Sequence, residues 1–214
     1  MLILIEVTVL GFMMGLSGAI IPGPVVAFVT QQSLINGFRS AVIATIGHAM
    51  VGAATLVLVL ATGITTVFGS SLFQLYAGLV GGLSLGVLGL GILRSSLKHP
   101  PPVQLNAPHS SYHSPFICGI IVTVANPSFF LWWAVIGLPT LGIASDIAGV
   151  PGIYCWTTGI IVSILLWYGG IAWIIARGRD HLPRRMHIVI SVACAMFLIL
   201  SGCYILAKYV FNLI

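Results

Sequence analysis

The sequence predicts an all-α integral membrane protein with six transmembrane helices. They form a 3+3 inverted-topology repeat in which the first and fourth helices are broken. Hydrophobic residues make up 59% of the chain and charged residues 5%, whereas soluble domains usually contain about a quarter charged residues. The apolar residues form six long runs, and proline interrupts the first and the fourth. Together these observations exclude an ordinary soluble domain.

Each apolar run reaches about 20 residues, enough to span a hydrocarbon core of ~30 Å. The runs are 2–34, 41–68, 72–93, 116–138, 153–176 and 188–210. As one straight helix the first would measure roughly 50 Å at ~1.5 Å per residue, so it must tilt strongly or break. It is too long for the core of a signal peptide and no basic segment precedes it, so we expect it to stay in the membrane.

A polar, proline-rich segment, residues 94–115, divides the chain into two similar halves. We expect 1–93 to form the first three-helix repeat, 94–115 a cytoplasmic linker, and 116–214 the second repeat. Because three is odd, the second repeat enters the membrane in the opposite orientation. The three histidines of the linker are more typical of a solvated loop than of a metal site, so we expect no metal.

The basic residues predict the orientation of the chain. Seven of the eight occupy alternate loops, while Lys208 falls on the other side; the seven are Arg39, Arg94, Lys98, Arg177, Arg179, Arg184 and Arg185. By the positive-inside rule these loops are cytoplasmic. Both termini are therefore expected on the outer side of the cytoplasmic (inner) membrane. Topology and contact with lipid headgroups account for the net charge of +5 better than nucleic-acid binding does.

The interruptions are Pro22-Gly23-Pro24 and Asn126-Pro127. Proline removes a backbone donor, and exposed backbone inside a membrane is tolerated only against protein or a water-filled cavity. Paired interruptions of this kind point to a transporter's binding site. The alternative is that both merely kink helices for packing. We expect the substrate-binding residues to be Pro22, Gly23, Pro24, Val25, His48, Asn126, Pro127 and Ser128.

Helix starts supply the expected chemistry of this site. Pro24 and Pro127 each suit the first position of a new half-helix. The N–H groups of residues 25–27 and 128–130 would then be open to an anion, and a carboxylate or phosphate is the natural ligand. Asn126 is a strong helix-cap residue that can also present its amide to a substrate.

His48 is the only ionisable side chain well inside an expected span, apart from cysteines and tyrosines. Such a residue is a candidate for substrate contact and proton coupling; the alternative is a neutral histidine bonded to a neighbouring helix. The three acidic residues lie elsewhere: Glu6 near the outer end of the first helix, Asp146 in an outer loop and Asp180 in a cytoplasmic loop. The sequence therefore offers no pair of carboxylates for acid–base catalysis, and we expect neither an enzyme nor a cofactor.

Aromatic and hydroxyl side chains gather around the fourth and fifth runs. Trp156 suits an anchor at the outer interface, and Thr157 and Thr158 suit hydrogen bonds across helices. Trp132 and Trp133 follow the second interruption and either pack the bundle or wall a pocket.

Small residues follow one face of the third run. Gly78, Gly82, Gly86 and Gly89 recur at spacings of four and three. Such a face lets helices approach closely, and the sequence leaves open whether it is buried within the bundle or in a homodimer interface.

Several motifs together resemble the lysine-exporter (LysE-type) translocator family. They are Ile21-Pro22-Gly23-Pro24, Ser33-Leu34 followed by Gly37-Phe38-Arg39, Gly47, Asn126-Pro127 and Leu166-Trp167-Tyr168. The resemblance covers essentially the whole chain. It implies export of amino acids or similar small metabolites, commonly driven by a proton or membrane gradient.

The chain departs from the family pattern at three places. Family members often carry Asn-Pro-Lys where this chain has Ser128, and some carry an acidic residue where it has Gly52. Many carry Asp near the position of Ser163. The pocket should therefore be less charged, which favours a neutral, zwitterionic or partly apolar substrate over a dibasic one.

The sequence thus favours a secondary transporter that exports an amino acid or similar carboxylate-bearing metabolite, with a small molecule and membrane lipid as its partners. One alternative is heavy-metal or cation efflux. Another is a membrane thiol-redox protein, because four cysteines lie in expected helices: Cys118, Cys155, Cys194 and Cys203. Without Cys-x-x-Cys spacing they are better interpreted as small buried residues.

Overall fold

The computed structural model confirms the all-α class. It describes residues 2–21, 23–62, 71–98 and 114–210, and no strand occurs among them. The elements are α1 (Leu2–Ile20), α2 (Pro24–Asn36), α3 (Phe38–Thr62), α4 (Ser71–Lys98), α5 (Pro115–Val124), α6 (Pro127–Trp132), the π-helix η2 (Trp133–Gly137), α7 (Leu138–Gly178), the 3₁₀ turn η3 (Arg179–His181), α8 (Arg184–Ile205) and the π-helix η4 (Leu206–Val210).

Five helical stretches within the described residues are long and apolar enough to cross a membrane. They are Leu2–Ile20, Phe38–Thr62, Gly78–Leu97, Ser128–Gly178 and Arg185–Lys208. The number differs from the expected six because the fourth apolar run is divided between α5 and the start of a 51-residue stretch. That stretch also contains the fifth run, so two expected spans are continuous in it. The chain is a multi-pass membrane protein.

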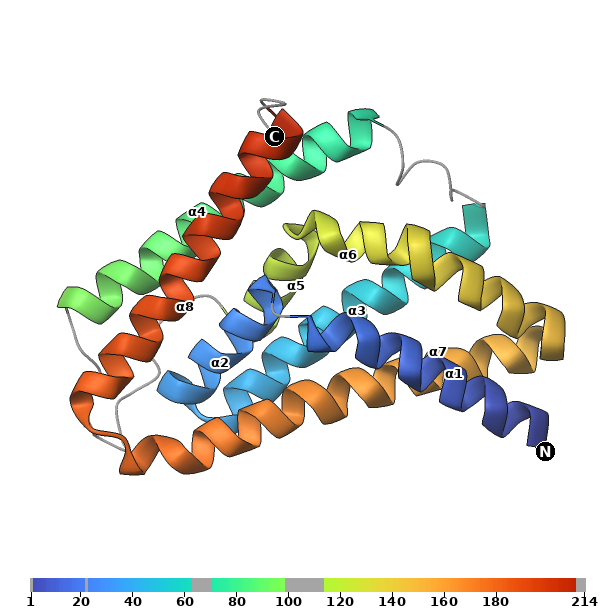
Figure 1. Cartoon of the computed structure of the whole chain (residues 1–214), viewed down its shortest axis with the longest axis horizontal. Helices are drawn as coiled ribbons and strands as arrows, with labels where there is room; N and C mark the ends of the chain where they lie inside the picture. The colour runs from blue at the N-terminus through green and yellow to red at the C-terminus, as the bar shows by residue number, and fades with distance from the viewer. Residues whose placement is uncertain (1, 22, 63–70, 99–113, 211–214) are drawn as a thin grey trace.

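A kink at Gly149 folds this 51-residue stretch back on itself. Gly149 has φ 58° and ψ −143° inside α7, a backbone conformation that favours glycine. Three residues later, the position of Gly152 faces the backbone carbonyl of Ala144, so a side chain there would collide. Figure 1 shows the two arms of α7 running back from one end of the molecule. Asp146, expected in an outer loop, instead lies in the helical arm before the kink.

Glycine positions set the closest helix pairings. A Cβ atom at Gly159 of α7 would contact the backbone of Thr8 of α1, and one at Gly119 of α5 would contact the backbone of Ala44 of α3. Small residues thus let these helices meet backbone to backbone. In α4, Gly82 and Gly89 lie against the backbone of α8 in the same way, so at least part of this glycine face is buried within the chain.

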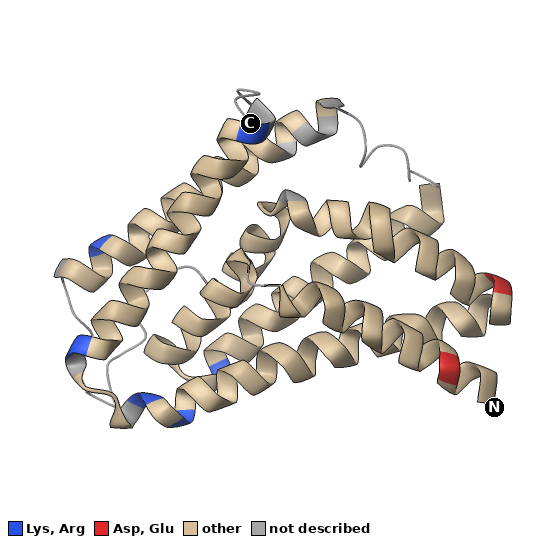
Figure 2. Cartoon of the chain, viewed as in Figure 1, with Lys and Arg blue, Asp and Glu red and all other residues tan. Residues whose placement is uncertain are grey.

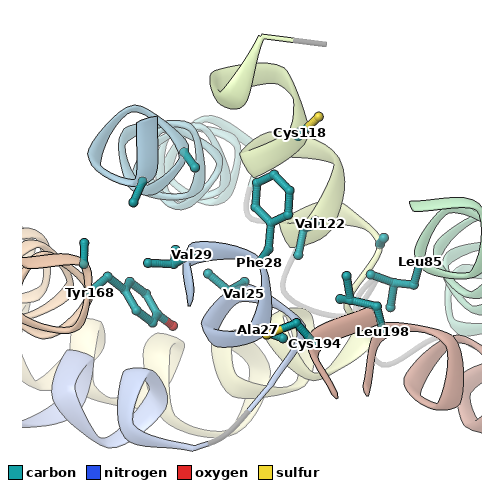
Figure 3. Packing of buried hydrophobic residues seen from close by; sticks show 14 of the residues in the cluster. Val25, Ala27, Phe28, Val29, Leu85, Cys118, Val122, Tyr168, Cys194 and Leu198 are labelled. Carbon is teal, nitrogen blue, oxygen red and sulfur yellow. The ribbon is translucent and has the colours of Figure 1, made fainter. Parts of the chain in front are cut away.

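The short helix α2 lies at the centre of the main core, in contact with α3, α5, α7 and α8. Figure 3 shows Phe28 of α2 beside Val122 of α5, and Leu85 of α4 beside Leu198 of α8. Burying α2 on several sides fixes its N-terminus relative to the other helices. This position matters for the cavity described below.

The linker and the cysteines differ in part from expectation. Residues 94–98 of the expected linker continue α4, α5 begins at Pro115, and residues 99–113 lie outside the described residues. Cys118 and Cys194 are buried as expected, but Cys155 is half-buried and Cys203 is exposed.

Candidate functional site

The N-terminus of α2 is built by Gly23 and Pro24. Gly23 is the extended N-cap residue and Pro24 is the first helical residue, as expected. The Ala27 N–H donates to the Gly23 carbonyl across 3.1 Å, so this expected open donor is used within the helix. The N–H groups of Val25 and Val26 precede it, and a helix start offers them no carbonyl of the same helix.

The N-terminus of α6 is capped by Asn126, as the sequence predicts. Its Oδ1 accepts from the Ser128 N–H across 3.1 Å, and its backbone carbonyl accepts from the Phe129 N–H across 3.0 Å. Ser128 and Phe129 therefore are not the open donors that were expected. Because Oδ1 faces the helix, the Nδ2 amide of Asn126 is the group that can donate elsewhere.

A cavity of about 370 Å³ joins these two helix starts. Six of the eight predicted residues line it: Gly23, Pro24, Val25, His48, Asn126 and Ser128. Pro22 lies outside the described residues, and Pro127 begins α6 with a side chain that the structure does not describe. Two motifs about a hundred residues apart in sequence thus meet at one cavity.

His48 is buried in α3, 9% exposed, and is one of the residues that line the cavity. Its Nδ1 lies 2.9 Å from the Thr123 Oγ1, and that hydroxyl donates its single proton to the Gly119 carbonyl across 2.7 Å. Nδ1 must therefore donate to Oγ1, which leaves Nε2 of the neutral ring as an acceptor. The expected alternative of a histidine bonded to a neighbouring helix is confirmed. His48 also lines the cavity, and its role in substrate contact or proton coupling stays a prediction.

Comparison with known proteins identifies the family. The model of the LysE type translocator family matches residues 16–209. The chain belongs to this family. The translocator is therefore a transporter of small molecules across a membrane and not an enzyme.

Two relatives of the translocator share low identity over most of their length. One, named "Putative amino acid efflux protein YcgF", from Bacillus subtilis, is 25% identical over 154 residues, 72% of this chain and 73% of the relative. The other, named "Chemotactic transduction protein ChpE", from Pseudomonas aeruginosa, is 23% identical over 178 residues, 83% of this chain and 86% of the relative. No solved structure matches the translocator.

Aromatic side chains form much of the cavity wall of the translocator, and the sequence indicated only part of this. Trp132 and Trp133 line the cavity, one of the two roles considered for them. Trp156, expected at the outer interface, is instead fully buried and lines the cavity edge-on to Trp133, with 6.1 Å between ring centroids. Thr157 and Thr158 donate to carbonyls of their own helix, not across helices.

Two aromatic rings hold the imidazole of His48, and sequence reasoning missed both. Phe129 of α6 and Tyr168 of α7 pack edge-on against it, with ring centroids 6.0 and 5.5 Å away. Their positions could have been suspected only from the neighbouring motifs, because Phe129 follows Asn126-Pro127 and Tyr168 ends Leu166-Trp167-Tyr168. Nothing in their spacing connects either residue to His48.

Proposed function

We propose that the translocator is a secondary transporter that exports an amino acid or similar small carboxylate-bearing metabolite across the cytoplasmic membrane. The observation that carries this proposal is the single cavity that reaches both helix starts, at Pro24 and Asn126. The name of the Bacillus subtilis relative, an amino acid efflux protein, supports the same class of substrate.

The substrate carboxylate is held by backbone and amide donors. Val25, Val26 and Asn126 all line the cavity, so we assign this role to the two backbone N–H groups and to the Asn126 Nδ2. The positive end of the α2 dipole adds to the attraction for an anion. Gly23 and Pro24 keep this end of the cavity open because neither carries a long side chain. Pro127 and Ser128 begin α6, and Pro22, which precedes Gly23 in the sequence, stays in the proposed site as a prediction.

His48 meets the other polar group of the substrate. Its Nε2 is an acceptor, which suits either the ammonium of an amino acid or a transported proton. We assign proton coupling to His48 because no Asp or Glu lies among the described residues that line the cavity. A buried ring clamped by Phe129 and Tyr168 can keep one orientation while it gains or loses a proton.

The architecture that we propose is a 3+3 inverted repeat of residues 1–93 and 116–214, joined by the linker 94–115. In each repeat the first membrane-spanning helix is broken, into α1 and α2 or into α5 and α6, and the second piece begins with proline. Rocking of one repeat against the other would open the cavity to each side in turn.

Charge distribution supports an orientation with both termini outside. Figure 2 shows most Lys and Arg residues toward the end where α7 ends and α8 begins, and the acidic residues that it colours at the opposite end. The third acidic residue, Asp180, belongs to η3 at the basic end. The positive-inside rule makes the basic end cytoplasmic. We expect membrane lipid and the small-molecule substrate as partners, and no nucleic acid.

Export from vesicles loaded with radiolabelled amino acids tests the proposal. Gly23→Leu should reduce export at least tenfold at normal protein level, because the new side chain fills the carboxylate end of the cavity. Gly23→Ala should retain most export, since the nearest atom to its Cβ would be the Ile21 carbonyl oxygen, at 3.7 Å.

Gly91→Leu is the matched control for added bulk. Gly91 is exposed on α4, and no atom outside the adjacent residues and backbone of its own helix lies within 4 Å of a Cβ built there. Equal export by Gly23→Leu and Gly91→Leu would refute the assignment of the cavity as the transport site. Absence of export by the wild-type protein for every amino acid would refute the proposed substrate class.

A further inference from the structure

One part of the cavity wall, here called the aromatic end, is apolar. It is formed by Gly52 and Leu56 of α3, Trp132 of α6, Trp133 of η2, and Trp156 and Ile160 of α7. All of these except Gly52 belong to one hydrophobic cluster or pack against it. The Nε1 atoms of Trp132 and Trp156 are buried. Because a buried atom does not border open space, these two indoles present carbon atoms to the cavity.

His48 lies between the aromatic end and the two helix starts. On one side its ring meets Phe129, which packs against the hydrophobic cluster of the aromatic end. On the other side it meets Tyr168, which belongs to the main core together with Val25 at the start of α2. An α-amino acid whose carboxylate is bound at the helix starts and whose ammonium meets His48 therefore has the aromatic end available for its side chain.

Gly52 leaves space at the aromatic end. It lies four residues after His48 in α3, about one helical turn, and is half-buried. No atom outside the adjacent residues and backbone of its own helix lies within 4 Å of a Cβ built at Gly52. A larger side chain at this position would therefore enter open space and would not collide with a neighbouring helix.

Two other glycines of the cavity wall have a different role. A Cβ built at Gly15 would collide with Ser163 and the backbone of α7, and one built at Gly18 would collide with the Trp132 ring. These glycines are required for packing against their neighbours. Gly52 has no such packing role, so the space beside it is available to a ligand.

We propose that the aromatic end binds the side chain of the transported amino acid and that Gly52 determines how large this side chain can be. The selected class is neutral amino acids with a large apolar side chain, aliphatic or aromatic, because binding removes apolar surface from water. A cationic side chain would lose its hydration without meeting a carboxylate, since no Asp or Glu occurs among the described residues that line the cavity. This inference rests on the proposed function and specifies its substrate class.

Ligand binding by the full-length protein in detergent tests the inference. The probes are L-alanine, L-leucine, L-phenylalanine, L-asparagine and L-lysine, and the readout is ligand-induced thermal stabilisation, which follows the dissociation constant. In wild type, L-leucine and L-phenylalanine should bind about tenfold more tightly than L-alanine, because each buried methylene raises the affinity about fourfold. L-Asparagine, which has the shape of L-leucine but is polar, and L-lysine should bind more weakly than L-leucine.

Gly52→Leu gives the sharper result, because it fills the aromatic end without touching the helix starts. It should weaken the binding of L-leucine and L-phenylalanine about tenfold and change that of L-alanine by less than about twofold. Gly91→Leu is the matched control, because Gly91 is an exposed helical glycine that does not line the cavity, and it should keep the wild-type order. Leucine favours a helix more than glycine does, so neither variant should lower the ligand-free melting temperature.

The outcomes separate the two proposals. If Gly52→Leu leaves all affinities unchanged, or weakens all of them by the same factor, the inference about Gly52 is wrong while amino-acid binding still stands. If wild type binds L-alanine, L-asparagine or L-lysine as tightly as L-leucine, the inference is likewise overturned, and this comparison needs no variant to fold. If no amino acid stabilises the wild-type protein, the proposed function fails and takes the inference with it.

Discussion

The Nδ1 of His48 and the Oγ1 of Thr123 lie 2.9 Å apart and form a buried hydrogen bond between α3 and α5. The bond lies beside a close helix crossing, at which a Cβ on Gly47 would contact the Phe116 backbone and one on Gly119 would contact the Ala44 backbone. Thr123 orients the imidazole, and the tight crossing fixes Thr123. One acceptor nitrogen of His48 is thereby held in a known direction.

Thr123→Val should disturb His48 without changing the volume of the site. Valine keeps the shape of threonine but removes the oxygen that accepts from His48, so a buried donor is left unsatisfied. We expect a loss of about 1–3 kcal/mol of stability, read as a lower melting temperature, together with reduced export. Thr123→Ser should keep the wild-type melting temperature and the wild-type export, because serine retains the hydroxyl that accepts from His48. If valine and serine behave alike, the hydrogen bond does not orient His48.

Asn126→Asp should separate the two roles of Asn126. Aspartate still caps α6 by accepting from the Ser128 N–H, so the melting temperature should change little. It replaces the donating Nδ2 with an anionic oxygen that repels a carboxylate, so export should fall at least tenfold. Asn126→Ala should lose both the helix cap and the amide donor, so export should fall and the protein should be about 1 kcal/mol less stable because the cap is missing. Full export by Asn126→Asp would exclude Asn126 from carboxylate binding.

Gly159→Ala should destabilise the pairing of α1 with α7. The new Cβ would meet the backbone of Thr8 and Phe12, which cannot move aside as a flexible side chain can. Overpacking of this kind costs about 1–3 kcal/mol. The control is Gly169→Ala in the same helix, where no atom outside the adjacent residues and backbone of that helix lies within 4 Å of the Cβ. Thermal unfolding in detergent measures both, and equal melting temperatures would contradict the close pairing.

Cysteine labelling in intact cells tests the orientation. Asp146, just before the kink of α7, and Arg185, at the start of α8, are exposed, and Figure 1 shows the kink and the start of α8 at opposite ends of the molecule. Each can therefore be changed to cysteine in a variant whose four natural cysteines are replaced. A membrane-impermeant maleimide should label Asp146→Cys and leave Arg185→Cys unlabelled until the cells are opened. The reverse pattern would place the basic loops outside and invert the proposed topology.

The sequence predicted the helices and the two helix starts because those features are local. Apolar runs of spanning length and the fixed φ of proline act within a few residues, so α2 was expected to start at Pro24 and α6 at Pro127, as the structure has them. The cap formed by Asn126 is local in the same sense. Each of these expectations needed no knowledge of neighbouring helices.

The sequence did not predict the features that depend on tertiary packing. Trp156 suits an interface anchor by composition, but Gly11 lets α1 lie directly on its backbone, and Trp133 covers its ring. The N–H groups of Ala27 and Ser128 were expected to be open, and carbonyl and amide oxygens within each helix start accept from them. Lys208 of η4 also lines the cavity, and this position depends on how α8 packs, which the local sequence does not specify.

A structure determined with a transported amino acid bound tests the central claim most directly. The account predicts that the ligand carboxylate lies within hydrogen-bond distance of the Val25 or Val26 N–H and of the Asn126 Nδ2, with its ammonium toward the His48 Nε2. A ligand carboxylate bound away from both helix starts, or a transported amino acid found outside this cavity, would contradict it.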